Sequence, residues 1–387
     1  MTENSLPVGY VDFHKKQLFN FQFNRWYTLG FARYEDMVDA GKRIQSFSDW
    51  KPVLVDLAEK AEQEKRYKNA AIYYRAAEFY ITQKDPDKLR FYDKFIELFY
   101  KEYEKVGVTK HKIPYQKSYL HAMYVPAKGK CKGTILMHGG FDSFVEEFYT
   151  MMSIFAQHGY EVIAYEGPGQ GGTRRKYNLA WDEHWEKPTK AVLDYFKKDK
   201  VTIYGISMGG HLCLRAAAFE PRITNVISSG GALDYWKIPG PISRGFLKLF
   251  LKLPNFTTKQ LVKKMKKDEH HNWFVENSMY ISKKDAPLDA MLTMFSMTEK
   301  NAQPKNITQD VLVLTGRNDH FIPIKMHNML LKSLKNAQSV KGIVYTKDTQ
   351  AHNHCQIGNI ALVTKDILEW LEQTQNNNFE CNVSPVK

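Results

Sequence analysis

Gly205, Ser207 and Gly209 form a Gly-x-Ser-x-Gly motif within the stretch VTIYGISMGGHLCLRAAAF, residues 201–219. The β-branched and aromatic residues before the motif favour a strand, and the small and apolar residues after it favour a helix. Glycines on both sides of the serine allow a sharp turn and let the helix pack close to the strand. Such a turn presents the Ser207 hydroxyl at the surface, which predicts a nucleophilic serine.

A serine hydroxyl is a weak nucleophile at neutral pH, so it needs a base and an acid that orients the base. Asp319 follows a predicted strand in VLVLTGRNDHFIP and is the predicted acid, with Asp234 in SSGGALDYW as the weaker alternative. His354 and His352 both lie in DTQAHNHCQIGN, after the last predicted strand. Imidazole titrates near neutral pH and suits proton transfer, so either histidine fits the base.

Donors for an oxyanion are expected from two loops. His138, Gly139 and Gly140 follow a predicted strand in TILMHGGFDS, where glycines allow amides to approach a carbonyl oxygen. We expect one donor from the backbone of Phe141 or Gly140 and another from Met208, the residue after the serine.

Polar residues near these loops are candidates for binding substrate. They are Asp142, Glu146 and Asp234, together with Glu147. Glu146 and Glu147 also fit the solvated first turn of a helix. Three further histidines, His211, His270 and His271, lack the position of a base and are expected to be structural. No metal-ligand spacing is found, and we expect no metal and no cofactor.

The elements that must position these residues alternate along the chain. Short strand-favouring runs separated by helical runs predict parallel β-α-β units with helices on both faces of one sheet. The predicted strands are Lys117–Val125, Thr134–Met137, Glu161–Tyr165, Val201–Tyr204, Val226–Ser228, Val311–Leu314 and Gly342–Thr346. Ligands bind at the carboxyl ends of such strands.

The predicted domain organisation has four parts. Residues 1–107 form an aromatic-rich helical extension, and residues 108–235 together with 301–373 form the α/β core. Residues 236–300 interrupt the strand rhythm and are expected to form a helical cap over the site. Residues 374–387 are polar and are expected to form a flexible tail.

Composition narrows the class of protein. The 387 residues carry 55 Lys and Arg against 42 Asp and Glu, a net charge of +13 spread along the chain without a long basic run or a nucleic-acid motif. The four cysteines show no disulfide pattern, and no apolar run approaches the length of a membrane span. We expect a cytoplasmic protein without a nucleic-acid or membrane partner.

Several segments resemble the α/β-hydrolases with an N-terminal helical extension, the family of dihydroxypseudooxynicotine hydrolase and of fungal hydrolases that shorten pigment polyketides. The resemblance rests on WKPVLVDLAEKAEQEKRYKNAAIYYRAAEFY, HGGFDSFVEEFY, YEGPGQGG, GISMGG, GRNDHFIP and AHNHCQIGN. It implies an α/β-hydrolase fold, a lid built from the extension and the insertion, and a homodimer. It also implies that the histidine before the cysteine, His354, is the base.

Together these features predict a serine hydrolase that cleaves an acyl–carbon or acyl–oxygen bond of a small molecule through an acyl-enzyme on Ser207. Cleavage of a carbon–carbon bond is what the resemblance implies. A carboxylesterase or peptidase of broad specificity is one alternative. A hydrolase-fold receptor that binds a ligand without cleaving it is another.

Overall fold

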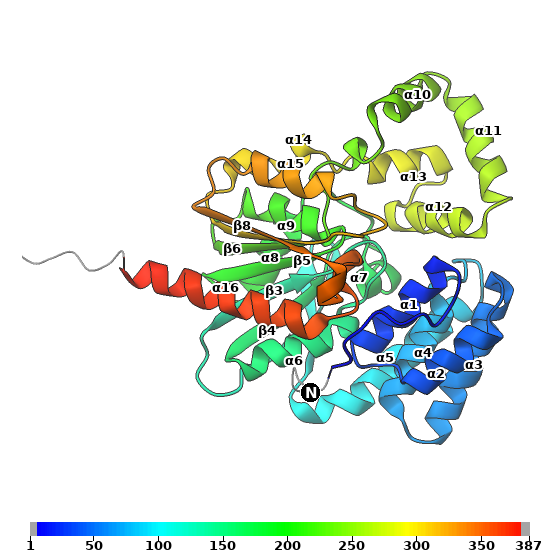
Figure 1. The fold of residues 1–387 in the computed structure, drawn as a ribbon, viewed down its shortest axis with the longest axis horizontal. Coiled ribbons are helices and arrows are strands. Elements are labelled where there is room, and N and C mark those ends of the chain that lie inside the picture. Colours follow the sequence, from blue (N-terminus) through cyan, green and yellow to red (C-terminus); the bar gives the residue numbers. More distant parts are fainter. Residues whose placement is uncertain (1–5, 381–387) are drawn as a thin grey trace, which may run out of the picture.

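The computed structural model describes residues 6–380, and a mostly parallel sheet of eight strands lies at its centre (Figure 1). The strand order is β1-β2-β4-β3-β5-β6-β7-β8. β2 pairs antiparallel with both β1 and β4, and the other neighbours are parallel. The bounds are β1 Thr109–Tyr115, β2 Ser118–Val125, β3 Gly133–His138, β4 Tyr160–Glu166, β5 Val201–Ile206, β6 Ile223–Ser229, β7 Asp310–Gly316 and β8 Ser339–Tyr345.

The seven strands predicted from the sequence are all present, and the structure adds β1. This strand lies at the edge of the sheet, contains Pro114 and buries only two of its seven residues. Edge strands tolerate proline and polar residues, so the sequence of β1 lacks the apolar pattern that marks a central strand.

Helices cover both faces of the sheet, as predicted. One face packs against α6 (Tyr149–Gln157) and α16 (Ile360–Glu380). The other packs against α8 (Glu186–Phe196), α9 (Gly209–Ala217) and α15 (Lys325–Ser333). α16 continues to Glu380, so the predicted flexible tail is helical from 374 to 380, and residues 381–387 lie outside the described part.

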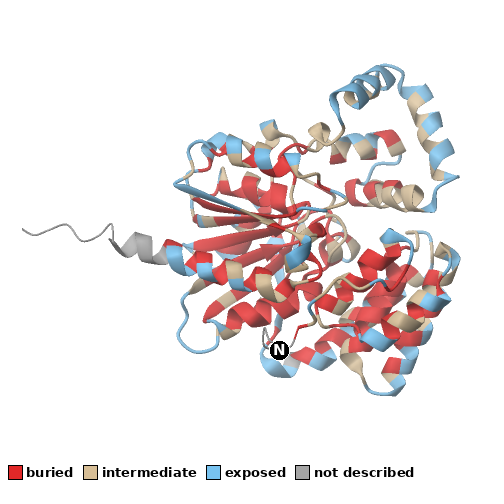
Figure 2. Cartoon of the chain, in the orientation of Figure 1, coloured by how far each residue is buried: buried red, intermediate tan, exposed pale blue. Residues whose placement is uncertain are grey.

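The N-terminal extension is a bundle of five helices. They are α1 (Gln17–Thr28), α2 (Tyr34–Arg43), α3 (Phe47–Gln63), α4 (Tyr67–Phe79) and α5 (Asp87–Tyr103). The buried residues of this bundle are continuous with the core on the α6 and α16 face of the sheet, as the red interior in Figure 2 shows. The extension therefore shares one hydrophobic core with the sheet and is not a separately packed unit.

A helical insertion separates β6 from β7. It contains α10 (Pro241–Leu251), α11 (Pro254–Met265), α12 (Glu269–Ser282), α13 (Pro287–Met294) and α14 (Glu299–Ala302). Figure 1 shows this insertion and the extension at the same end of the sheet. They meet where the indole nitrogen of Trp273 donates to the carbonyl oxygen of Phe79 at 2.6 Å and the two rings stack.

Buried ion pairs join the extension to the core. The Glu78 carboxylate lies 2.9 Å from both Arg175 in α7 (Gly171–Arg175) and Lys88, and it also pairs with Arg75 at 2.5 Å. Arg75 in turn lies 3.1 Å from Glu147 of the core. Burial opposes ionisation of Glu78, but the three cations outweigh it and lower the pKa of its carboxyl to about 2.

No helix among residues 6–380 is both long enough and apolar enough to cross a membrane.

Candidate active site

Ser207 lies on the turn between β5 and α9 with a φ of +62°. Residues other than glycine rarely adopt this left-handed conformation, because it strains the backbone and needs support from the surrounding structure. The amide of Ser207 donates to the carbonyl oxygen of Ser229 at 2.8 Å, which fixes the turn. Residues 205 and 209 must be glycine because a side chain at either position would clash with the backbone nearby. A Cβ on Gly205 would lie 2.0 Å from the Gly209 oxygen, and one on Gly209 would lie 2.6 Å from the Gly139 oxygen.

His354 contacts both Ser207 and Asp319. Ser207 Oγ and His354 Nε2 are 2.9 Å apart, and His354 Nδ1 and Asp319 Oδ2 are 2.6 Å apart. The other oxygen of Asp319 accepts from the amides of Phe321 and Ile322, which orients the carboxylate. The residues predicted as nucleophile, base and acid therefore lie in one hydrogen-bonded chain.

The surroundings of His354 set its proton affinity. Burial lowers the pKa of this imidazole, but the charge and hydrogen bond of Asp319 outweigh burial and raise it well above its ordinary value. A proton on Nδ1 donated to Asp319 leaves Nε2 free to accept from the Ser207 hydroxyl. This is the arrangement that a general base for the serine requires.

The two alternatives for base and acid lie elsewhere. The ring of His352 packs edge-on against Tyr10, with centroids 6.2 Å apart, and its Nε2 lies 3.4 Å from the Asn353 side chain. Asp234 is buried, and its carboxylate caps a short helix by accepting from the amides of Lys237 and Glu299. Asp234 is also absent from the pocket lining, so its position does not support the prediction that it contacts substrate.

The loop after β3 approaches the serine closely. A Cβ on Gly140 would lie 2.8 Å from the backbone nitrogen of Met208, so only glycine allows this contact. The Gln170 side-chain amide donates to the carbonyl oxygens of Gly139 and Gly140 at 2.8 and 3.0 Å. The Gly140 amide donates to Ser143 Oγ inside the loop, so of the predicted donors Phe141 and Met208 fit the oxyanion best.

Gln170 is a positioning residue that the sequence did not single out, although it lies in the motif YEGPGQGG. It is buried, and both protons of its amide are used to hold the loop. Neither its residue type nor its spacing distinguishes it from a turn glutamine, because its partners lie about 30 residues earlier in the chain.

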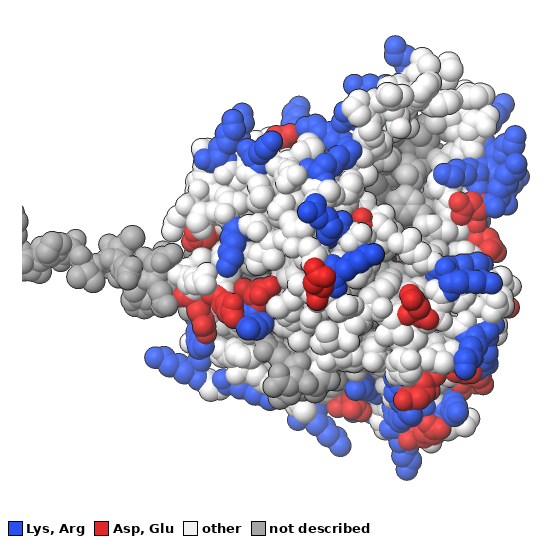
Figure 3. Space-filling model, viewed as in Figure 1, with Lys and Arg blue, Asp and Glu red and all other residues white. Residues whose placement is uncertain are grey.

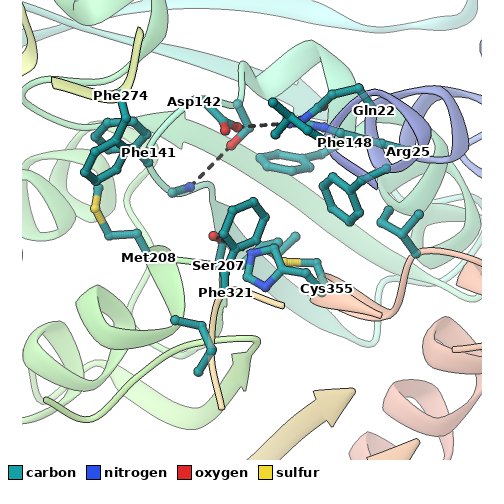
Figure 4. Close-up of a pocket in the computed structure, with 18 of the residues that line it drawn as sticks. Gln22, Arg25, Phe141, Asp142, Phe148, Ser207, Met208, Phe274, Phe321 and Cys355 are labelled. Atoms are coloured by element: carbon teal, nitrogen blue, oxygen red, sulfur yellow. Dashed lines mark hydrogen bonds and ion pairs between the residues drawn. The ribbon is translucent and has the colours of Figure 1, made fainter. Parts of the chain in front are cut away.

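Ser207 opens into a pocket of about 370 Å³ (Figure 4). Its lining is mainly apolar and comes from three separate segments. The extension contributes Leu18, Phe21, Gln22, Arg25, Leu29 and Tyr80. The insertion contributes His270, Trp273, Phe274, Met294 and Met297, and the remaining lining residues belong to the core and its loops. A pocket of this size and character suits a small organic molecule.

Asp142 is the predicted substrate-binding residue that does line the pocket. Its carboxylate lies 2.9 Å from the guanidinium of Arg25, which reaches the pocket from α1 (Figure 4). Arg25 also lies 3.1 Å from Glu147. The sequence did not single out Arg25, because one arginine in an amphipathic helix carries no local signal of such a contact.

Glu146 and Glu147 are fully buried, so their interpretation as a solvated helical turn is wrong. Glu146 is held by His121 Nε2 at 2.9 Å and the Tyr100 hydroxyl at 3.2 Å, and it is absent from the pocket lining. Its position therefore does not support the prediction that it contacts substrate. Both glutamates hold the turn that follows the loop of Gly140 against the extension and the sheet.

Two of the histidines that were expected to be structural, His211 and His270, lie in different surroundings. His211 is buried and bonded to the carbonyl oxygen of Ala232 and to Asn301, as expected for a structural residue. His270 lines the pocket from α12. Across residues 6–380, no group of three or more His, Cys, Asp or Glu side chains is arranged to hold a metal ion.

Comparison with known proteins gives matches over most of the chain. The family model described as serine aminopeptidase S33 matches residues 129–347. Hydrolase LUC6 of Fusarium sp is 30% identical over 348 residues, and the 20-hydroxy-prefusarin hydrolase FUS2 of Gibberella moniliformis is 28% identical over 348 residues. Each of these matches covers 80% of this chain and 80% of the relative.

The crystal structure of 2,6-dihydroxy-pseudo-oxynicotine hydrolase has a similar fold. It matches with a TM-score of 0.68 and 22% sequence identity, covering 90% of this chain and 94% of that one. The similarity includes the helical extension as well as the sheet, because the match spans nearly the whole of both chains.

Proposed function

The chain belongs to the α/β-hydrolases of the serine aminopeptidase S33 family, and we propose that it cleaves an acyl–carbon or acyl–oxygen bond through an acyl-enzyme on Ser207. The observation that carries this proposal is the hydrogen-bonded chain from Ser207 through His354 to Asp319 at the wall of the pocket. The hydrolytic class itself follows from the family.

The proposed reaction begins when Ser207 Oγ attacks the substrate carbonyl carbon and His354 Nε2 takes the hydroxyl proton. The amides of Phe141 and Met208 donate to the oxyanion of the tetrahedral intermediate. The acyl–X bond then breaks, and His354 returns the proton to X. A water molecule attacks the acyl-enzyme by the same steps and releases the acid.

The leaving group X is carbon or oxygen in this proposal. An ester requires only the three residues and the oxyanion donors, whereas a β-diketone also requires support for an enolate before it is protonated. Arg25 and Asp142 are polar groups in an otherwise apolar pocket and could supply that support. Because of these two residues, we propose carbon–carbon cleavage as well as ester cleavage.

A peptidase that recognises a free amino terminus has less support. Recognition of an ammonium group needs an acidic side chain in the pocket, and Asp142 is already neutralised by Arg25 at 2.9 Å. A receptor without activity is also less well supported, because such a protein gains nothing from an oriented serine and histidine. The proposed ligand is thus a small, largely apolar acyl compound. The homodimer and the cytoplasmic location stay predictions.

A substrate screen tests the proposal. Aryl esters, alkyl esters and β-diketones are incubated with the purified protein, with Ser207→Ala and with Ser333→Ala, and the products are identified by mass spectrometry. Ser333 lies on α15, and its hydroxyl donates only within that helix, so this variant controls for loss of a serine. We expect turnover by wild type and Ser333→Ala and none by Ser207→Ala. Wild-type turnover by Ser207→Ala would refute the mechanism.

A further inference from the structure

Helices α10 and α11 expose an unusual number of large apolar side chains. Neither helix has a buried residue. Six apolar side chains between residues 242 and 256 are from 41% to 79% exposed; they are Ile242, Phe246, Leu249, Phe250, Leu253 and Phe256. A contiguous apolar surface of this kind marks an interaction site on a folded protein.

These side chains form one surface. Ile242, Phe246 and Leu249 follow each other at spacings of four and three residues, which places them on one side of α10. Leu253 lies in the turn between α10 and α11. The rings of Phe250 and Phe256 stack across the turn between the helices, with centroids 6.1 Å apart. Figure 2 shows both helices exposed at the outer edge of the insertion, away from the sheet.

The same two helices are strongly basic. Residues 241–267 contain eight lysine or arginine residues and no aspartate or glutamate: Arg244, Lys248, Lys252, Lys259, Lys263, Lys264, Lys266 and Lys267. None of the eight forms an ion pair with a carboxylate in the part of the chain that the structure describes. Figure 3 shows basic side chains gathered beside α11, and mostly uncharged surface with a few basic side chains over α10.

We propose that the α10–α11 hairpin docks on an anionic lipid surface. The apolar side chains enter the boundary between headgroups and acyl chains, while the surrounding lysines contact the anionic headgroups, as in helices that lie in the plane of a membrane interface. This binding is peripheral. The proposal departs from the expectation of no membrane partner, which rested on the absence of an apolar run long enough to span a membrane. It extends the function proposed above but does not depend on it, because no residue of the serine site takes part.

The uncompensated cations and the exposed aromatic rings of the hairpin favour lipid over a second copy of the chain as its partner. Pairing of this surface with itself would bring two sets of eight cations together without compensating carboxylates, which opposes a symmetric interface. Binding of an anionic bilayer instead neutralises the cations and buries the aromatic rings. α12 follows α11 directly and lines the pocket with Trp273 and Phe274, so a bound bilayer would lie near the pocket wall.

Vesicle flotation of the full chain, without substrate, tests the proposal. Vesicles of phosphatidylcholine alone are compared with vesicles that also contain phosphatidylserine, at low and high salt. We expect binding only with phosphatidylserine, and weaker binding at high salt because salt screens the lysines. Phe246→Asp/Phe250→Asp and Lys248→Glu/Lys252→Glu should each lower the partition coefficient at least about tenfold.

Matched substitutions outside the hairpin serve as controls. Leu89→Asp changes an exposed apolar residue of α5, and Lys335→Glu changes an exposed lysine after α15. Both should bind vesicles as the wild type does. All variants should keep the wild-type thermal unfolding midpoint, because every residue substituted in the hairpin and in the controls is exposed.

Three results would overturn the proposal. The first is no phosphatidylserine-dependent binding by the wild type, and the second is unchanged binding by both hairpin variants. The third comes from sedimentation equilibrium: a wild-type dimer that becomes monomeric in Phe246→Asp/Phe250→Asp, without lipid binding by either, would assign the hairpin to a second copy. Because binding is read without turnover, these results are independent of whether the protein hydrolyses esters or diketones.

Discussion

His354 and His352 differ in what their rings contact, although one residue separates them. His354 bridges Ser207 and Asp319, while His352 packs against Tyr10. We expect His354→Ala to lower kcat by about 10⁴-fold or more, as loss of a general base for a serine does. His352→Ala should lower it less than about tenfold. Steady-state kinetics on an active ester decide between them, and the reverse ranking would move the base to His352.

In the proposed mechanism Asp319 also sets the pH dependence of activity. The base must be neutral to accept the serine proton, and Asp319 raises the pKa of His354 well above 6.5. We therefore expect kcat/KM of the wild type to rise with pH through a midpoint above 6.5. Asp319→Asn removes the charge, so burial dominates, the midpoint moves to lower pH and the maximum falls. An unchanged midpoint in the kcat/KM profile would contradict this role of Asp319.

Single residues were predicted from sequence only where the backbone dictates their position. Ser207 lies between glycines that the turn requires, and Asp319 and His354 follow strand ends, so element boundaries bring them together. Glu146 lies only four residues after Asp142. Asp142 lines the pocket, whereas the side chain of Glu146 points into the core and contacts His121. Local sequence contains no sign of that difference, because it depends on a partner from another strand.

At the scale of elements, the buried charges between α4, α5 and α7 hold the extension in place. Glu78 accepts from Arg75, Lys88 and Arg175, and each of these cations is itself nearly buried. A buried charge destabilises the folded state unless it is paired. Removing the Glu78 carboxylate would take away the anion that these three buried cations share.

Glu78→Gln is therefore expected to lower the free energy of unfolding by about 3–5 kcal/mol. The folded-state pKa of Glu78 is about 2 against an ordinary 4.5, so its contribution is present above pH 4.5 and is lost as the pH falls toward 2. Urea unfolding at pH 7 and at lower pH measures both effects. Glu97→Gln, at an exposed position of α5, is the control and should change stability by less than about 0.5 kcal/mol. Equal effects of the two substitutions would contradict this network.

Elements with a strong apolar period were predicted well, and those that depend on tertiary packing were not. The central strands are continuous apolar runs, and the structure confirms all seven predicted strands. For the extension the sequence predicted a helical region without the bounds of its helices, and the structure has five helices there. The bounds of α1 are hard to predict because its buried face includes Asn20, Gln22 and Asn24, whose polar type hides the helical period.

At the scale of the whole molecule, the pocket exists only because three chain segments meet. Phe21 of the extension lies against His354, with ring centroids 6.1 Å apart, and Trp273 of the insertion bonds to the extension. The sequence predicted an extension and an insertion near the site. The family resemblance implied a lid built from both segments, and residues of both do line the pocket. The residue patterns did not show which side chains these would be, since that depends on contacts between residues far apart in the chain.

Deletion of residues 1–105 should consequently remove one wall of the pocket and expose the apolar core shared with the sheet. It also leaves the buried Glu147 without Arg25 and Arg75. We expect the truncated protein to be largely insoluble, measured as the soluble fraction after expression. Deletion of residues 381–387, which removes no described element, should leave the soluble fraction unchanged. A soluble core with the substrate preference of the full chain would show that the extension has no part in the site.

In the proposed mechanism Ser207 is a nucleophile that His354 and Asp319 activate. The most direct measurement is peptide mapping by mass spectrometry after reaction of the full chain with a fluorophosphonate, which traps an activated serine covalently. We expect one modified residue, Ser207, with labelling abolished in Ser207→Ala and strongly slowed in His354→Ala. Labelling of Ser207→Ala at the wild-type rate, or no labelling of the wild type, would contradict this mechanism.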